Sequence, residues 1–170
     1  GEWFAAQGDP VRAVRFFAAA GRDGDMTRML ELFAQEWAIL ILARDPEGIP
    51  PLVLAAPWRV RLGRPLGWLG FLHAWQRVGN VARIVELLGE TRKRIALDKT
   101  LSIEQKRYFA GEMELILGVA DFNDLRAMLR RWATGNRLLR GTPSALQLPR
   151  QAWAFAGPHA GYMYVREPGE

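Results

Sequence analysis

Few residues of this sequence have the type and spacing that a catalytic or metal site needs. The chain contains two histidines, His73 and His159, which lie far apart in the sequence, whereas a structural or catalytic metal site gathers about three or four ligands. His73 stands in the apolar run "GFLHAW", where a hydrogen-bonded helix residue is expected, and His159 follows a proline in a predicted surface turn. The histidines therefore predict neither a metal site nor acid–base catalysis.

One pair of carboxylates, Glu112 and Glu114, is close enough in the sequence to be considered for acid–base catalysis. Such catalysis needs two groups with separated pKa values in one cleft. Residues two positions apart point to different sides of a helix, and we expect both side chains to be solvated. We thus predict no carboxylate-based active site.

Motifs that bind phosphate groups or activate a nucleophile are also missing from the sequence. There is no Walker loop, no G-x-G-x-x-G and no G-x-S-x-G. The absence of cysteine removes disulfides, thiolate zinc sites and cysteine nucleophiles together. We therefore expect no enzyme and no cofactor in this segment.

The basic charge invites a nucleic-acid interpretation, because the net charge is +5 and the sequence pI is about 10.2. The densest basic groups are "TRKR" at 91–94 and "RAMLRRW" at 126–132. A nucleic-acid surface would need Arg126, Arg130, Arg131 and the 91–94 group on one continuous face. Solvated helix faces opposite apolar stripes are the ordinary alternative, which we favour.

The length and composition are those of one globular domain. The chain has 170 residues, 49% hydrophobic and 24% charged, close to the averages for folded domains, so it can bury a core without metals or disulfides. No apolar run is long enough for a membrane helix, and no signal peptide is visible. We expect a soluble, cytoplasmic segment without membrane contact, and the missing initiator Met suggests a fragment excised from a longer chain.

Capping residues and the spacing of apolar residues predict helices through most of the chain. Asp9 followed by Pro10 starts one helix, which ends at Gly21. Apolar residues at helical spacing predict a further helix over 26–41, and "SIEQ" at 102–105 is a capping box. The last helix is expected to begin after "DFND" and to end at Gly135.

Five prolines between residues 46 and 65 interrupt this pattern. Because proline breaks the interior of a helix, we expect one short helix around 51–56 and irregular chain on both sides of it.

Three joints between helices resemble one another. "FAAQGDPVRAVRFF" and "WQRVGNVARIVELL" share an aromatic residue, a glycine, a capping Asp or Asn and an apolar helical run, and "GVADFNDLRAMLRRW" is a looser copy. The separation of the first two fits two repeats of about 34 residues. The predicted fold is all-α, a tetratricopeptide-like helical-repeat array (α-solenoid) over 1–150; a compact, non-repeating bundle is the alternative.

Aromatic residues are the most distinctive part of the composition. Those expected in the core are Phe17, Phe33, Trp37, Phe71, Trp75 and Phe109. In "QAWAFAGPHAGYMYVREPGE", at 151–170, aromatics alternate on both sides of a Gly-Pro turn, which predicts an extended segment packed on the helices. The candidate contacts for an effector, a partner or intramolecular packing are Trp153, Phe155, Tyr162, Tyr164 and Trp75.

Several stretches resemble one family of regulators. "EWFAAQGDPVRAVRFFAAAG" followed by "MLELFAQEW" is similar to the start of the helical-repeat region of MalT-type, LuxR-family transcriptional regulators, and "RPLGWLGFLHAWQRVGN" is similar to a later stretch. "EMELILGVADFNDLRAM" resembles one subgroup, as does a terminal motif matched by Trp153, Phe155, Pro158, Tyr162, Met163, Tyr164, Arg166 and Glu167.

The resemblance implies that this segment is one module of a larger, multidomain regulator. In such regulators an upstream ATPase module binds ATP and a downstream helix-turn-helix domain binds DNA, and neither is expected in these 170 residues. This segment would sense a small-molecule or peptide effector and control DNA binding and assembly, with self-association as a further possibility. The alternatives are a generic helical-repeat scaffold for protein–protein interaction and a basic nucleic-acid-binding domain.

Overall fold

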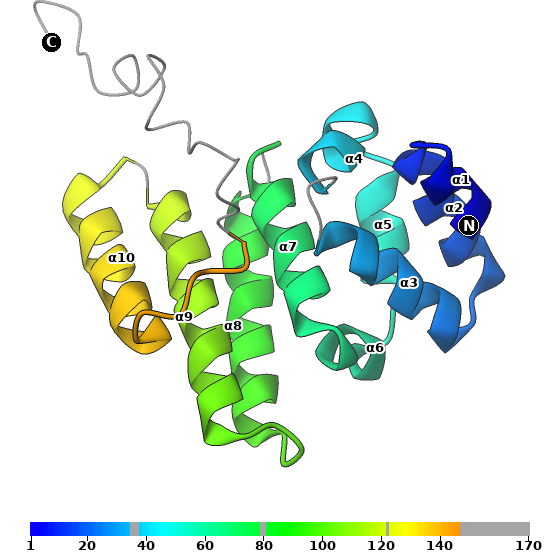
Figure 1. Ribbon diagram of the computed structural model, residues 1–170. Helices are drawn as coiled ribbons and strands as arrows, with labels where there is room; N and C mark the ends of the chain where they lie inside the picture. The colour runs from blue at the N-terminus through cyan, green and yellow to red at the C-terminus, as the bar shows by residue number, and fades with distance from the viewer. Residues whose placement is uncertain (35–37, 79–80, 122, 147–170) are drawn as a thin grey trace, which may run out of the picture.

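The chain folds into helices. The computed structural model describes residues 1–34, 38–78, 81–121 and 123–146, and within these ranges it contains ten α-helices and no strand. The prediction of an all-α fold is confirmed. The helices follow one another in a row, from α1 at one end to the α9–α10 pair at the other (Figure 1).

The longest helices lie at the end of the described chain. In chain order the helices are α1 (Glu2–Ala6), α2 (Pro10–Ala20), α3 (Asp23–Phe33), α4 (Ala38–Arg44), α5 (Ile49–Leu54), α6 (Trp58–Gly63), α7 (Pro65–Gln76), α8 (Val81–Leu97), α9 (Ile103–Ala120) and α10 (Leu125–Leu139). Two predicted caps are present: Asp9 accepts a hydrogen bond from the Arg12 N–H, and Ser102 and Gln105 form the capping box. Asp25 or Thr27, expected from the sequence to cap the third helix, does not do so, because α3 already begins at Asp23 with Arg22 as its N-cap.

The proline-rich stretch holds two short helices, so the prediction of a single helix at 51–56 was wrong. Helices α5 and α6 both form because each proline stands where a helix needs no N–H donor. Pro50 and Pro51 lie in the first turn of α5, Pro57 is the N-cap of α6, and Pro65 is the first residue of α7. First-turn N–H groups have no partner inside the helix, so their loss costs nothing there.

The helix predicted over 26–41 is two helices. Helix α3 ends at Phe33, and the N–H of the capping Ala34 bonds the Glu31 carbonyl in a tightened last turn. Helix α4 starts at Ala38, and both helices pack against α7. The spacing of apolar residues indicates which residues are buried, but it does not indicate whether they belong to one continuous helix or to two.

The last helix does not end at Gly135, as the sequence suggested; α10 continues to Leu139. Arg140 then ends it in the left-handed conformation, at φ 51°. Gly135 is buried because α10 approaches α9 closely there: a Cβ on Gly135 would lie 3.1 Å from the Gly111 carbonyl oxygen. The glycine therefore serves packing, not termination.

Helix α7 is the centre of the molecule. Every residue from Gly67 to Gln76 is buried, and Trp68, Phe71 and Trp75 stack on one another at centroid distances of 5.5 and 5.2 Å. Phe33 of α3 meets the Phe71 ring edge-on at 5.4 Å. Of the predicted core aromatics Phe17, Phe33, Phe71, Trp75 and Phe109 are buried, which confirms those five, whereas Trp37 lies outside the described residues.

Two glycines let the backbone of α3 touch α7. A Cβ on Gly67 would lie 2.2 Å from the Leu30 carbonyl oxygen, and one on Gly70 would lie 2.0 Å from the Phe33 carbonyl oxygen. Both distances are far inside van der Waals contact. Glycine at these two positions is therefore what allows α3 to cross α7 at this separation.

A buried arginine fastens the connection between α5 and α6. The Arg61 guanidinium donates to the Ala56 carbonyl oxygen at 2.8 Å and to the Leu54 carbonyl oxygen, so it satisfies the end of α5. Its Cζ lies 4.6 Å from the ring centroids of both Trp58 and Trp68, where the faces of the rings stabilise a cation. Burial lowers the pKa of Arg61 from its usual value.

The close crossing of α3 and α7 at Gly67 and Gly70 can be tested by a substitution that adds one methyl group. Gly70→Ala is expected to lower the free energy of unfolding by about 3 kcal/mol, because the new Cβ must displace the α3 backbone. Gly89→Ala is the matched control: Gly89 also lies inside a helix, α8, but nothing lies within 4 Å of its added Cβ. It should stabilise the protein by about 0.5–1 kcal/mol. Urea unfolding followed by tryptophan fluorescence measures both, and equal stability of the two variants would refute the crossing.

Candidate functional site

Only one of the aromatic residues proposed as contacts from the sequence lies in the described part of the chain. Trp75 is buried on α7, 8% exposed, and its ring stacks on Phe71. The structure therefore gives it a packing role. Trp153, Phe155, Tyr162 and Tyr164 lie outside the described residues, as does all of 151–170, for which the sequence predicts an extended segment.

A groove lies where four parts of the chain meet. It has a volume of about 490 Å³ and lies between the end of α3, the α6–α7 junction, the α8–α9 connection and the first turns of α9. Its lining residues are Glu31, Ala34, Leu62, Gly63, Arg64, Pro65, Leu66, Gly67, Thr100, Leu101, Gln105 and Phe109. Sequence reasoning missed this groove, because its walls come from segments up to about eighty residues apart in the chain.

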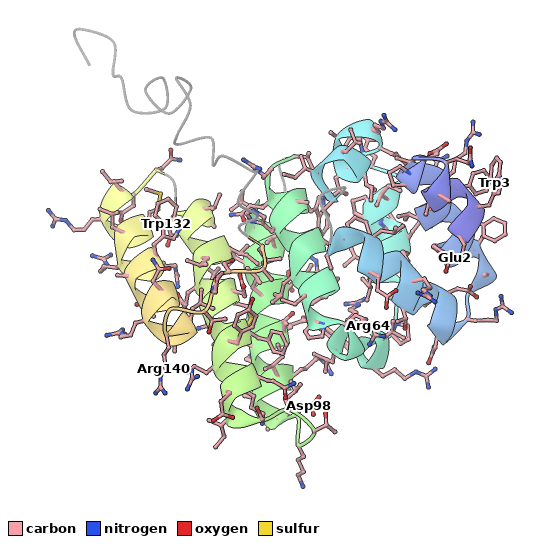
Figure 2. The ribbon with its side chains drawn as sticks, viewed as in Figure 1. Glu2, Trp3, Arg64, Asp98, Trp132 and Arg140 are labelled. Carbon is pink, nitrogen blue, oxygen red and sulfur yellow. The ribbon has the colours of Figure 1, made fainter. Side chains whose placement is uncertain are left out.

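Local structure fixes each wall of the groove. Pro65 starts α7 directly after α6, so the α6–α7 junction turns sharply at Arg64. Thr100 is held by Asp98, whose carboxylate accepts from the Thr100 N–H at 2.7 Å and from its hydroxyl at 2.6 Å. Gln105 is held by the capping box with Ser102. Figure 2 shows Arg64 beside α3, and Asp98 at the α8–α9 connection.

The charged residues that line the groove, Glu31 and Arg64, form an ion pair. Arg64 Nε donates to Glu31 Oε1 at 2.9 Å, and the side chains are 51% and 33% exposed. Arg28 Nη1 donates to the second oxygen of Glu31 at 3.3 Å. The hydrogen bond from Arg64, together with Arg28, lowers the pKa of Glu31 below its usual value. The groove thus offers a carboxylate and a guanidinium side by side.

Most of the remaining lining is apolar and forms the apolar wall of the groove. Leu62, Leu66 and Leu101 are half-buried, and Phe109 is buried. All four pack in or against the hydrophobic core. A mainly apolar lining with a few polar groups is the usual composition of a small-molecule site.

The carboxylates Glu112 and Glu114 are buried, so the expectation that both are solvated was wrong. They are 0% and 8% exposed, because α9 is covered by α8, α10 and α7. They do point to different sides of α9, as expected. Each is satisfied there by its own set of donors, and neither faces the groove.

Glu112 anchors the chain that follows α10. Its carboxylate accepts from the Ser144 hydroxyl at 2.6 Å and from the Ala145 N–H at 2.8 Å. Tyr108, one turn earlier on α9, accepts from the same Ala145 N–H at 3.0 Å. Burial, and then the neighbouring Glu112, raise the pKa of Tyr108 to about 12. These contacts hold residues 143–146 on α9.

Glu114 joins three helices. It accepts from Arg92 of α8 and, at 3.1 Å, from Arg131 of α10, which also donates to Asp121 at 2.7 Å. Arg94 lies over the Trp58 ring instead. Arg92 and Arg131, which the nucleic-acid interpretation needs on a basic face with Arg126 and Arg130, are therefore paired with acidic side chains.

His73 is a buried residue of α7. Burial, and to a smaller extent the charge of Arg77, lower the pKa of His73 to about 4. The imidazole is 9% exposed and lies outside the groove. This placement agrees with a structural helix residue.

The comparisons with known proteins give no relative. No protein-family model, curated protein or solved structure matches this chain. None of the described helices has the length and apolar composition of a membrane-spanning segment. Within the same residues, no group of three or more histidines or acidic residues could hold a metal ion.

Removing the Glu112 carboxylate should release residues 143–146. Glu112→Ala is expected to cost about 2 kcal/mol of unfolding free energy, because it leaves two partly buried donors without their charged acceptor. Amide hydrogen exchange should rise at Ala145 and Leu146. Glu86→Ala, which removes an exposed carboxylate from α8, is the control and should leave that exchange unchanged. Unaltered exchange in Glu112→Ala would contradict the anchor.

The low pKa of His73 should make stability fall in mild acid. The unfolded imidazole takes up a proton near pH 6.5, whereas the folded one does so only near pH 4. Stability is therefore highest above pH 6.5 and falls by about 3 kcal/mol as the pH drops to 4. His73→Gln should remove this part of the loss, in urea unfolding series at several pH values. Parallel curves for the two proteins between pH 6.5 and 4.5 would refute burial of the neutral imidazole.

Proposed function

We propose that this chain is the effector-sensing, regulatory segment of a MalT-type, LuxR-family transcription regulator, and that the groove at Glu31 and Arg64 is its effector site. The single observation that carries the effector site is the mixed origin of the groove walls, from α3, α6–α7 and α9. A ligand held there touches helices from both ends of the row. The membership in the family rests on the sequence resemblance alone.

The physical requirement for a sensor is differential binding. A ligand shifts a conformational equilibrium only if it binds one arrangement better than the other. A groove built from separate helices meets this requirement, since its shape depends on how α3 and α9 sit against α7. The ATPase and DNA-binding modules would lie elsewhere in the longer protein, which as a transcription regulator would act in the cytoplasm.

The tetratricopeptide-like architecture belongs to the same proposal. In its support, α2 packs on α3 and α9 packs on α10 as neighbouring pairs, which is how such arrays are built. Packing of α3 on α7 across three intervening helices fits the alternative of a non-repeating bundle equally well.

A thermal-shift screen of small sugars, amino acids and short peptides tests the effector site. A true effector at one hundred times its Kd should raise Tm by about 5–10 °C, since saturation at that level stabilises by about 2.7 kcal/mol. Phe109→Ala should weaken that response, and Arg130→Ala, on the outer face of α10, should not. A screen in which no compound raises Tm, or a hit whose effect Phe109→Ala leaves intact, would overturn the assignment.

A protein-interaction scaffold is the second candidate, and the outer face of α10 favours it. Leu125 and Leu129 are 49% and 53% exposed. Three exposed arginines at helical spacing on α10, and Arg140 directly after it, take part in no ion pair with another described residue; the three are Arg126, Arg130 and Arg137. A leucine and arginine surface of this kind suits a partner with apolar and acidic side chains.

The same face allows a decisive measurement of DNA binding. We expect fluorescence anisotropy with a labelled double-stranded oligonucleotide to give, at about 150 mM salt, no binding tighter than a non-specific Kd of roughly 10⁻⁶ M. Arg126→Glu combined with Arg130→Glu should abolish what remains. Sequence-specific, nanomolar, salt-dependent binding by the isolated segment would sink the sensor proposal in favour of direct DNA recognition.

A further inference from the structure

The groove holds its two charged groups in an arrangement that suits one class of ligand. We propose that it binds a free α-amino acid with a large apolar side chain, the ammonium on Glu31 and the carboxylate on Arg64. This inference rests on the proposed function of the groove and adds the chemical class of the effector to it.

The ion pair presents both charges within reach of one small ligand. Glu31 Oε1 and Arg64 Nε are 2.9 Å apart, and an α-amino acid carries its ammonium and carboxylate on a single carbon. Arg64 uses Nε toward Glu31 and Nη1 toward the Gly63 carbonyl oxygen, at 3.0 Å. Its Nη2 takes part in neither bond. A ligand carboxylate can therefore bind Arg64 while the pair stays formed.

A ligand with one charge can pair with only one of the two groups, Glu31 or Arg64. A ligand with only a carboxylate would place two anions, its own and Glu31, around the Arg64 guanidinium. A ligand with only an ammonium would add a third cation to Arg28 and Arg64 around Glu31. A zwitterion meets one opposite charge at each end, so it adds no net charge to the site.

The apolar wall sets the other half of the specificity. Leu62, Leu66, Leu101 and Phe109 line the groove and offer no hydrogen bond to a polar side chain. Thr100 and Gln105, its other polar lining residues, already bond Asp98 and Ser102. A large aliphatic or aromatic side chain buries against this wall, and a small or charged one does not.

Isothermal titration with four probes tests the class. L-phenylalanine is expected to bind. N-acetyl-L-phenylalanine, which lacks the ammonium, and L-phenylalaninamide, which lacks the carboxylate, should each bind at least about tenfold more weakly, and L-alanine should bind weakly for want of apolar area. Equal binding of L-phenylalanine and either blocked derivative would overturn the proposal.

Two variants test which residue binds which charged group of the ligand, and a third variant is the control. Glu31→Gln should remove the preference for L-phenylalanine over the N-acetyl derivative, and Arg64→Gln should remove the preference over the amide. Arg59→Gln breaks an ion pair between α6 and α3, with Asp23 at 2.7 Å, and should leave all preferences unchanged. Because each readout is a ratio of two affinities, a general loss of stability cannot imitate it.

The outcomes separate this inference from the proposed function. If the thermal screen finds an effector whose action depends on Phe109 but which is not an apolar amino acid, the ligand class is wrong and the effector site stands. If L-phenylalanine binds with the same preferences in Arg64→Gln as in the unmodified chain, its site is elsewhere and the inference falls. If no compound binds, both fall together.

Discussion

The contact between α3 and α7 is the constraint on which the rest of the molecule depends. Carbonyl oxygens of α3 lie where side chains of Gly67 and Gly70 would begin, so the two backbones approach to a distance that only glycine allows. This approach brings Phe33 onto Phe71. It also sets Glu31 against Arg64. The core and the groove are thus consequences of the same crossing.

Helix α9 organises the other end of the row through buried charge. Glu112 and Glu114 could not be buried as unpaired carboxylates, because an isolated ionised group in the interior costs several kcal/mol. Their donors come from α8, from α10 and from the segment after α10. The two carboxylates therefore determine which elements must lie against α9, and Gly111, Gly118 and Gly135 let α10 come close enough.

Sequence patterns predicted the helices and much of the core, because caps and apolar spacing are local. The capping box at Ser102 and the burial of Phe71 follow from neighbours within a few residues. The burial of Glu112 and the second proline-rich helix escaped prediction, since each depends on a partner or a position in the first turn that spacing alone does not reveal. Arg64 escaped for the same reason: its partner Glu31 comes from another helix.

The groove and the crossing of α3 with α7 share Gly67, so ligand binding in the groove is coupled to the position of α3 on α7. Gly67 lines the groove and also receives the Leu30 carbonyl of α3. A shift of α3 along α7 therefore moves Glu31 relative to Arg64 and to the apolar wall in one step. Exposed ion pairs contribute little to stability on their own, so a ligand can bind to Glu31 and Arg64 without weakening the fold. A ligand that needs both charges at once will favour the arrangement in which they are adjacent, and this preference is the differential affinity that regulation requires.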